Sequence, residues 1–444
     1  MKCQLQSAIR GARRIYHLLH GDKILRAIGD YKASRVVPFV MQNYCQGLSR
    51  IRLKANNNEK IRILFLISDA SKWKMQTVFD AMAKSERFDP LVAVSQFGWH
   101  ESRSAAEATG RQTMQFFKGR GMPVVNACSD ELHRAAPLEA FSPDIVFYGQ
   151  PWDVEPAHDP VAVSRYALTC YVPYYVPNFA PQNFDYAMPF HRTIFRYFLM
   201  NETCIKIYRD AMGALTSAGE MVAVGHPMLD CFSEGDFAGN DNCGVVIYAP
   251  HWSFPHKDNP NAANISTFLW TGRAMLDYAK SHSEIKWAFK PHPVLRGALI
   301  KSGVMSKGEV DDYYSAWDAV GESCYDGNYV DLFKRSRMLV TDCASFLTEY
   351  ACTGKPIVRL VSPVAISQPG ELNGELYSTY YQVHTPEELE PMLDKIVVRR
   401  EDPNREARLS AAKAMNLTGV DAAGNIVTHL KNLIWGSGRN EEEN

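Results

Sequence analysis

Short apolar runs alternate with amphipathic, helix-compatible stretches along most of the chain. The first alternation places a strand at residues 61–67, a helix at 75–83 and a second strand at 91–94. This order implies a right-handed crossover and therefore a parallel sheet. Further elements are expected in the first half of the chain, with strands at residues 124–125, 144–148, 168–172, 195–200 and 221–224 and a helix at 204–212.

A second alternation follows residues 231–243, which are rich in Gly, Asp, Asn and Ser and predict a linker. The second set comprises strands at residues 245–248, 285–289, 338–340 and 357–361 and helices at 265–281, 345–353, 387–400 and 405–434. The last two helices are expected to close the second domain. The clearest unit is 336–361, where Gly354 and Pro356 follow the helix as a C-cap and a helix stop.

The pattern predicts an α/β fold with two Rossmann-like domains of the glycosyltransferase-B type. The expected segments are a basic helical N-terminal segment (1–58), a first domain (59–230), a second domain (240–400) and closing C-terminal helices (401–436). Facing carboxyl edges of two such sheets are expected to form a ligand cleft. The chain lacks GxGxxG after its first strand and lacks GxxxxGK[ST], which disfavours a dehydrogenase and a P-loop enzyme.

Composition narrows the class of protein further. The 444 residues are 46% hydrophobic and carry a formal net charge of −1, which argues against a dedicated nucleic-acid binder. Ten cysteines are scattered without a CxxC pair or zinc spacing, which favours free thiols in a reducing cytosol. No apolar run reaches membrane-span length, and no signal peptide is evident.

The N-terminal residues 1–60 are strongly basic, with twelve Lys or Arg against three Asp or Glu. Apolar residues from Leu5 to Leu19 recur at helical spacing. Such a segment suits an anionic membrane surface, and it equally suits a helix packed on the core with solvated charges. Phe39 and Tyr44 fit either reading. The membrane-surface interpretation predicts a cytoplasmic protein that is peripheral on the inner face of the membrane.

Three loops of the second half follow strands, are expected to converge and carry the candidate chemistry. They read APHWS from Ala249, KPHP from Lys290 and TDCAS from Thr341. Two prolines restrain His292, so its imidazole is aimed toward whatever it binds. The TDCAS turn offers hydroxyls and helix N-terminal amides, which suit a pyrophosphate, although Asp342 or Ser345 would serve equally as simple helix caps.

Together these loops resemble the CDP-glycerol glycerophosphotransferase family, which includes the teichoic acid primases and polymerases. The matching stretches are YAPHW at 248–252, KPHP at 290–293, TDCAS at 341–345 and GHPMLD at 225–230. The family pattern reads approximately YAPTW, KxHP, TDYSS and GxPxxD, and the resemblance covers residues 60–400. It implies transfer of glycerol phosphate from CDP-glycerol to a lipid-linked or polysaccharide acceptor in surface-polymer biosynthesis, with release of CMP.

The resemblance also implies roles for particular residues. His292 and the turn containing Thr341, Asp342 and Ser345 would hold the donor pyrophosphate. Lys290 is placed by the sequence itself, because it lies beside His292 and would add positive charge to the same phosphate contacts. The sequence alone suggests the roles of two further residues. Trp252 would wall the site or stack on the base, and it suits core packing equally. Glu349, one helical turn beyond Ser345, would reach a ribose or merely solvent. No metal or cofactor is required beyond the CDP-activated donor, because histidine, lysine and helix dipoles can carry the phosphate charge.

Three departures from the family pattern affect the predicted chemistry. His251 replaces a threonine, Cys343-Ala344 replaces Tyr-Ser, and residues 171–175 stand where the family has a Trp-His-Gly element with a catalytic histidine. Protons would then fall to His251 and to a first-domain histidine. The candidates there are His191, His158 and His100, each of which suits a surface or capping role as well. The acceptor pocket would be lined by Tyr174 and Tyr175, which suit core packing equally.

Three functions therefore remain in view. The first is glycerophosphate transfer, with an acceptor hydroxyl attacking the β-phosphorus of a CDP-activated alditol. The second is a nucleotide-sugar glycosyltransferase of surface-polysaccharide assembly, in which attack is at an anomeric carbon. The third is a catalytically silent nucleotide-binding member of the same assembly, suggested by the altered element at residues 171–175.

Overall fold

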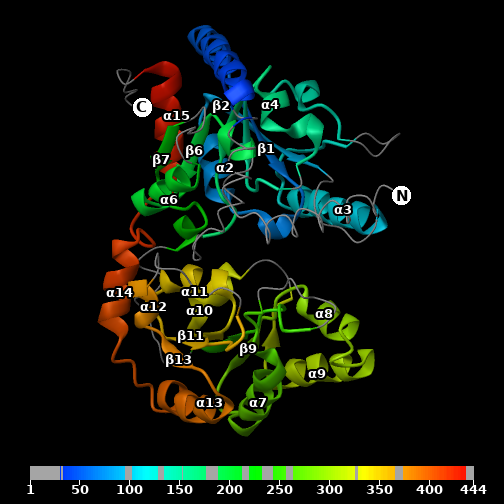
Figure 1. Cartoon of the computed structure of the whole chain (residues 1–444), viewed down its shortest axis with the longest axis vertical. Helices are drawn as coiled ribbons and strands as arrows, with labels where there is room; N and C mark the ends of the chain where they lie inside the picture. Colours follow the sequence, from blue (N-terminus) through cyan, green and yellow to red (C-terminus); the bar gives the residue numbers. More distant parts are fainter. Residues whose placement is uncertain are drawn as a thin grey trace. The chain divides into compact units, whose positions relative to one another are not determined.

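The computed structural model describes residues 31, 34–95, 103–128, 135–152, 154–176, 189–212, 220–232, 244–256, 264–325, 329–365 and 374–436. The chain divides into two compact units. The first comprises Met1–Tyr174, Pro181–Met228 and Asp421–Asn444, and the second comprises Tyr175–Ala180 and Leu229–Val420. Each unit contains one sheet with helices around it, as Figure 1 shows.

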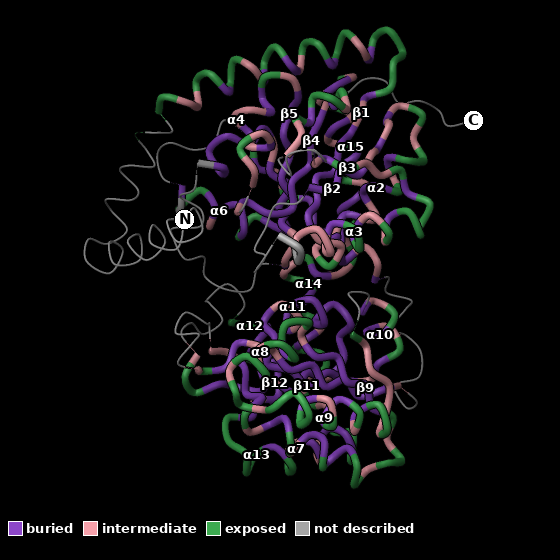
Figure 2. The backbone as a smooth tube through the Cα atoms, turned by 90° about the vertical axis from the view of Figure 1, so that its right-hand side faces the viewer, coloured by how far each residue is buried: buried purple, intermediate pink, exposed green. Residues whose placement is uncertain are grey.

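The first unit is built on a parallel sheet with the order β3-β2-β1-β4-β5-β6-β7. Its strands are β1 (Ile61–Ile67), β2 (Phe88–Val94), β3 (Val124–Asn126), β4 (Ile145–Tyr148), β5 (Leu168–Tyr171), β6 (Arg196–Leu199) and β7 (Glu220–Ala223). Six of the seven residues of β1 are buried, because helices or loops cover both faces of a parallel sheet. Figure 2 shows these buried strands in the interior of the unit.

Helices supply the rest of the first core. They are 34–56, α2 (Gln76–Ala83), α3 (Arg103–Gly119), α4 (Pro160–Val163), α6 (Glu202–Met212) and α15 (Ala422–Trp435). Alternate residues of β1, such as Phe65, share one cluster with Val78 of α2 and Leu430 of α15. The last helix therefore belongs to the first unit, whereas the sequence led us to expect that it would close the second domain.

The second unit contains a parallel sheet with the order β10-β9-β8-β11-β12-β13. Its strands are β8 (Val245–Ala249), β9 (Trp287–Phe289), β10 (Glu322–Ser323), β11 (Ser336–Thr341), β12 (Ile357–Leu360) and β13 (Tyr381–Val383). Its helices are α7 (Phe268–Ser281), α8 (Leu295–Lys301), α9 (Lys307–Val320), α10 (Val330–Arg335), α11 (Ala344–Ala351), α12 (Gly374–Ser378), α13 (Pro386–Leu393) and α14 (Arg405–Ala414).

Both sheets follow the doubly wound order in which the first strand lies beside the second on one side and the fourth on the other. This is the Rossmann order, and it confirms the predicted α/β fold class with two Rossmann-like domains. The strand order reverses between β1 and β4 in the first sheet and between β8 and β11 in the second. Ligands of open α/β sheets bind at the carboxyl ends of strands at such switch points.

Several local expectations need correction. The expected helix 405–434 is two helices, α14 and α15, with Asn416 and Gly419 between them in left-handed backbone conformations. The expected helix 387–400 is α13 followed by a π-helical turn at Asp394–Val398. Most of the predicted linker, residues 233–243, lies outside the described residues.

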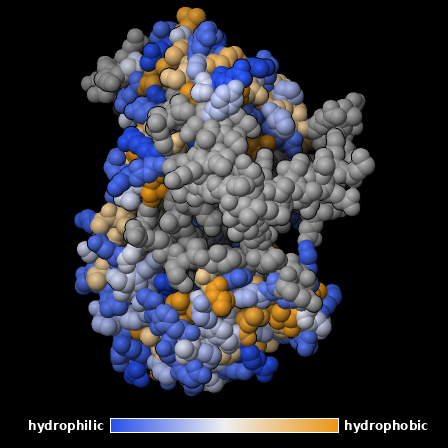
Figure 3. Space-filling model, viewed as in Figure 1, coloured by the Kyte–Doolittle hydropathy of each residue, from blue (hydrophilic) through white to orange (hydrophobic). Residues whose placement is uncertain are grey.

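The helix 34–56 helps to distinguish the two interpretations of the basic N-terminal segment, which are binding to a membrane surface and packing on the core. One face is buried in the first core through Val40, Tyr44 and Ile51, and Lys54 forms an ion pair with Asp144 at 2.6 Å. Core packing therefore accounts for this part of the segment, while residues 1–30 lie outside the described residues. None of the described helices is both long enough and apolar enough to cross a bilayer. On the face drawn in Figure 3, hydrophilic residues predominate over the described surface.

Candidate functional site

The loops after β8 and β11 meet at the switch point of the second sheet, and Asp342 joins them. Its Oδ1 accepts a hydrogen bond from the His251 amide at 2.6 Å. Its Oδ2 accepts from the Thr267 amide at 2.6 Å and from the Thr267 hydroxyl at 2.9 Å. Burial raises the pKa of Asp342 to about 6, although these hydrogen bonds oppose the rise. The carboxylate therefore fixes the loop backbone at the place where a doubly wound sheet binds its ligand.

Three aromatic side chains gather beside this junction. The ring centroids of His251 and His292 are 4.9 Å apart, and Trp252 lies 5.8 Å from His251 and 6.2 Å from His292. The His292 amide donates to the Pro250 carbonyl at 3.0 Å, which ties the KPHP loop to the APHWS loop. The three loops predicted to converge do converge, within one unit.

Both histidines are neutral near pH 7. Desolvation, with repulsion from His292, lowers the pKa of His251 well below its usual value. Desolvation, with repulsion from Lys290, lowers the pKa of His292 to about 4. The cause is the same for both, because burial disfavours the charged imidazolium.

Hydrogen bonds also fix which ring nitrogen carries the proton in each histidine. The Ser253 amide donates to His251 Nδ1 at 3.1 Å, and the Ser253 hydroxyl, 2.9 Å from the same nitrogen, can also donate to it. The Val294 amide donates to His292 Nδ1 at 3.2 Å. A neutral imidazole that accepts at Nδ1 carries its proton on Nε2. The network therefore assigns two Nε2–H donors, which suit phosphate oxygens and do not suit proton abstraction by Nε2.

The turn after β11 is arranged for support as much as for binding. The buried Thr341 hydroxyl donates to the Ala249 carbonyl at 2.6 Å and accepts from the Cys343 amide at 2.9 Å. Thr341 and Asp342 thus hold neighbouring loops together. Ser345 is half-buried in the first turn of α11, where the N-cap residue Cys343 makes no side-chain cap. The amides of this turn are suited to an anion.

Lys290 and Glu349 are both buried in the second unit, where Lys290 follows β9 and Glu349 lies in α11. Lys290 is 3% exposed at the end of β9, where its amide donates to the Tyr248 carbonyl at 2.9 Å. Glu349 is buried in α11 and accepts a hydrogen bond from the Tyr329 hydroxyl. This contact gives Glu349 a structural explanation that the sequence did not supply.

The switch point of the first sheet carries a second polar cluster. Lys72, in the turn after β1, donates to Gln150 Oε1 at 2.8 Å and lies 5.7 Å from the Tyr174 ring centroid. Trp152 packs edge-to-face on Tyr174 with centroids 5.9 Å apart. The sequence singled out Tyr174 but missed Lys72 and Gln150, although both follow strands at the carboxyl edge. The division between the units falls directly before Tyr175.

Two of the three candidate histidines of the first domain, His191 and His158, lie among the described residues and are buried. His191 packs against Tyr171 and Tyr208, and desolvation lowers its pKa to about 3. His158 lies between Ser95 Oγ, 3.0 Å from its Nδ1, and the Ala136 carbonyl, 2.8 Å from its Nε2. His100 lies outside the described residues. Packing accounts for His191 and His158, and the described part of the chain holds no group of three His, Cys, Asp or Glu arranged for a metal ion.

The motif GHPMLD also has a structural explanation. His226 is buried, and its Nε2 lies 2.9 Å from the Pro173 carbonyl, while its Nδ1 accepts from the Met228 amide at 3.3 Å. Gly225 adopts a left-handed backbone with φ of +93°, which glycine tolerates without strain. This motif therefore stabilises the end of β7 and its neighbouring loop within the first unit.

No protein-family model and no curated protein matches the chain. Among solved structures, S. aureus MnaA in complex with UDP matches with a TM-score of 0.51 and 10% identity, covering 86% of this chain and 99% of that chain. A UDP-GlcNAc 2-epimerase from Neisseria meningitidis bound to UDP-GlcNAc gives 0.52 and 13%, covering 84% and 99%. Another UDP-N-acetylglucosamine 2-epimerase gives 0.53 and 13%, covering 86% and 98%. The chain shares their fold, which is of the glycosyltransferase-B type.

Proposed function

We propose that this chain is an enzyme that acts on a nucleotide-activated sugar in the assembly of a cell-surface polymer. The proposal rests first on the hydrogen bond from the His251 amide to Asp342, which joins the loops after β8 and β11 at the switch point of the second sheet. The pyrophosphate of the donor would bind there. Its nucleoside would pack on the aromatic wall that includes Trp252.

The donor groups at this switch point suit a leaving nucleoside diphosphate. His251 and His292 offer Nε2–H donors, Lys290 contributes a positive charge, and the first turn of α11 offers backbone amides. These groups stabilise the negative charge that develops as the bond to the diphosphate breaks. In this proposal the two histidines bind phosphate oxygens, and the general base is another group.

The fold comparison favours a sugar nucleotide over CDP-glycerol. The neighbours at TM-scores of 0.51–0.52 were crystallised with UDP and UDP-GlcNAc, and they share the two-domain architecture. UDP-sugars are accordingly the first donors to test. Both sugar transfer and epimerisation at the sugar ring need the nucleoside diphosphate held in place.

Glycerophosphate transfer from CDP-glycerol is the second candidate. It is favoured by the convergence of the YAPHW, KPHP and TDCAS stretches on one switch point, as the sequence resemblance implies. The same donors would hold the pyrophosphate of CDP-glycerol, with CMP leaving instead of a nucleoside diphosphate. The two candidates differ in the bond that breaks, so their products separate them.

The test incubates the purified chain with UDP-GlcNAc or CDP-glycerol, together with a lipid-linked or glycerophosphate-primed acceptor. Phosphorus NMR then distinguishes UDP from CMP, and proton NMR detects epimerised sugar. We expect sugar-nucleotide turnover that falls at least about 100-fold in His292→Ala. His282→Ala is the matched control, because His282 ends α7 before β9 and thus lies near the opposite edge of the sheet.

The outcomes of this test distinguish the candidate functions. CMP release from CDP-glycerol that depends on His292 would favour the second candidate. Binding of a donor without turnover of either would favour the silent nucleotide-binding protein. Full activity in His292→Ala would refute the role proposed for the switch point.

We also propose that the basic residues 1–30 attach the protein to an anionic membrane surface on the cytoplasmic side. The support is the charge of this part of the sequence and its helical apolar spacing. Sedimentation with phosphatidylglycerol vesicles tests it, because electrostatic attachment is lost at high salt. Equal sedimentation of a chain that begins at residue 31 would contradict it.

A further inference from the structure

The amino-terminal edge of the second sheet holds a cavity that the proposed function does not use. The cavity is about 340 Å³ in volume, and its walls include Arg337 at the start of β11, Lys355 before β12, Arg400, Asp402 and Arg405. This size is that of a small-molecule site and exceeds the room that a bare phosphate needs. Met338, Pro356 and Ile396 supply apolar wall.

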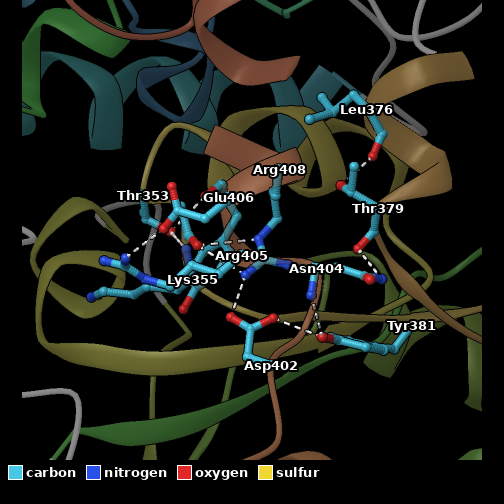
Figure 4. A network of polar contacts seen from close by, with 12 residues as sticks. Thr353, Lys355, Leu376, Thr379, Tyr381, Asp402, Asn404, Arg405, Glu406 and Arg408 are labelled. Atoms are coloured by element: carbon cyan, nitrogen blue, oxygen red, sulfur yellow. Dashed lines mark hydrogen bonds and ion pairs between the residues drawn. The ribbon is translucent and has the colours of Figure 1, made fainter. Parts of the chain in front are cut away.

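The charge of the cavity wall is strongly positive. Four basic side chains line it against a single acid, Asp402. That acid is engaged by protein partners, since its Oδ2 accepts from Arg408 at 2.6 Å and its Oδ1 from the Tyr381 hydroxyl at 2.7 Å. Figure 4 shows Asp402 facing Arg408 and Tyr381. The acid therefore offsets little of the charge of Arg337, Arg400 and Arg405.

The contacts of Lys355 and Arg405 define the part that each plays in the site. The Lys355 ammonium donates to the carbonyls of Phe333, Lys334 and Ser336 at 3.0, 2.7 and 2.5 Å, so it mainly stabilises the end of α10. Arg405 lies 3.2 Å from Glu406, and their side chains are 53% and 85% exposed, so this pair is weak. The guanidinium groups of Arg337, Arg400 and Arg405 are the expected ligand-binding groups.

The backbone beside the cavity is irregular where Arg400 is presented. The π-helical turn Asp394–Val398 contains Ile396, and Arg400 adopts a φ of +59°. Turns of this type and left-handed non-glycine residues are frequent at functional sites. Arg337 and Arg400 also repel each other, because desolvation and the charge of Arg400 lower the pKa of Arg337. A bound anion would relieve the repulsion between these guanidinium groups.

The cavity is separate from the switch point described above. Arg337 lies at the start of β11 and Thr341 at its end, so the two sites are at opposite edges of one sheet. A strand of this length spans about 20 Å. A ligand in the cavity would therefore contact neither His251 nor His292.

We propose that this cavity is a second binding site, specific for the phosphoryl group of a small phosphorylated molecule. Guanidinium groups bind phosphate oxygens in bidentate fashion, and three of them match a multiply charged anion better than a single carboxylate. The apolar wall and the volume provide for an organic portion attached to the phosphate.

The test measures binding of inorganic pyrophosphate to the full chain by calorimetry. Hydrogen exchange then locates the site in peptides that cover residues 353–356 and 394–405. We expect slower exchange in these peptides, and we expect Arg400→Gln/Arg405→Gln to need at least about tenfold more pyrophosphate to reach this protection. Arg273→Gln is the control, because its side chain is 80% exposed on α7 and pairs with Asp277.

The His292→Ala variant separates this site from the switch point. We expect it to retain the protection at residues 394–405 even if pyrophosphate binding elsewhere is lost. Tighter binding of glucose 6-phosphate than of inorganic phosphate would assign an esterified ligand, and the reverse order would assign free phosphate. Absence of protection in the wild-type chain, or equal protection in the double variant, would overturn the proposal.

Discussion

At the scale of single residues, one buried carboxylate organises the proposed site. Asp342 accepts three hydrogen bonds from two separate segments, the loop at His251 and the start of α7 at Thr267. The sequence predicted that Asp342 would lie near the other loops. It could not predict that both carboxylate oxygens are used by the protein, because capping and ligand binding require the same residue type.

Replacing Asp342 by asparagine should weaken the second unit. An amide nitrogen would then face one of the N–H or O–H groups that the carboxylate now accepts, and a buried unsatisfied donor costs about 1–3 kcal/mol. We expect a loss of about 2 kcal/mol in the free energy of unfolding by urea. Asp277→Asn is the control, since Asp277 is half exposed and pairs with Arg273 on the surface. An unchanged midpoint for Asp342→Asn would show that the three bonds are not needed.

The neutral state of His292 predicts a pH dependence of stability. Its folded pKa of about 4 lies below its ordinary value of 6.5, so the unfolded chain binds more protons between these values. The stabilising contribution is therefore full above pH 6.5 and is lost as the pH falls through 4. Between pH 7 and pH 4, the free energy of unfolding should fall by about 2 kcal/mol less in His292→Gln than in the wild type. Parallel curves would contradict the assignment of a neutral, half-buried ring.

At the scale of elements, the unit from β11 to β12 was the most predictable part of the chain. The expected helix 345–353 is α11 (Ala344–Ala351), and its C-cap is Cys352; Gly354, expected as the C-cap, lies two residues further on with a φ of +65°. By contrast, α3, α8 and α9 were not predicted. For α9 the signal was present, because Ser306 and Glu309 form a capping box that the sequence displays.

Gly354 should tolerate substitution less well than another glycine with the same backbone. A Cβ on Gly354 would meet the Leu409 side chain of α14 at 2.3 Å, whereas one on Gly303, at a φ of +71°, would meet nothing within 4 Å. We expect Gly303→Ala to cost about 1 kcal/mol from backbone strain alone and Gly354→Ala about 1–3 kcal/mol more. Equal costs in thermal unfolding would show that Leu409 moves aside freely.

At the scale of the whole molecule, the two parallel sheets followed from the alternating pattern, but the destination of the last helix did not. An amphipathic helix shows which face is buried and does not show which sheet it covers. In the structure α15 packs with α2 in the first core, so the chain returns to its first unit after completing the second. This connection makes residues from both ends of the described chain necessary for one core.

Substitutions in α15 should therefore destabilise the first unit. Leu430 is fully buried among residues of the first core, and its replacement by alanine should cost about 2–5 kcal/mol. Asn432→Ala, on the exposed side of the same helix, is the matched control. Hydrogen exchange should quicken in β1 and α2 and remain unchanged in β8 and β11. Faster exchange confined to the second sheet would contradict the packing of α15.

The most direct test of the account is the binding of UDP to the full chain by isothermal titration calorimetry. We predict a nucleotide-binding event that weakens at least about tenfold in His292→Ala and is unchanged in His282→Ala. Wild-type affinity in His292→Ala, or no binding of UDP to the wild-type chain, would contradict the claim that the switch point of the second sheet holds a nucleoside diphosphate.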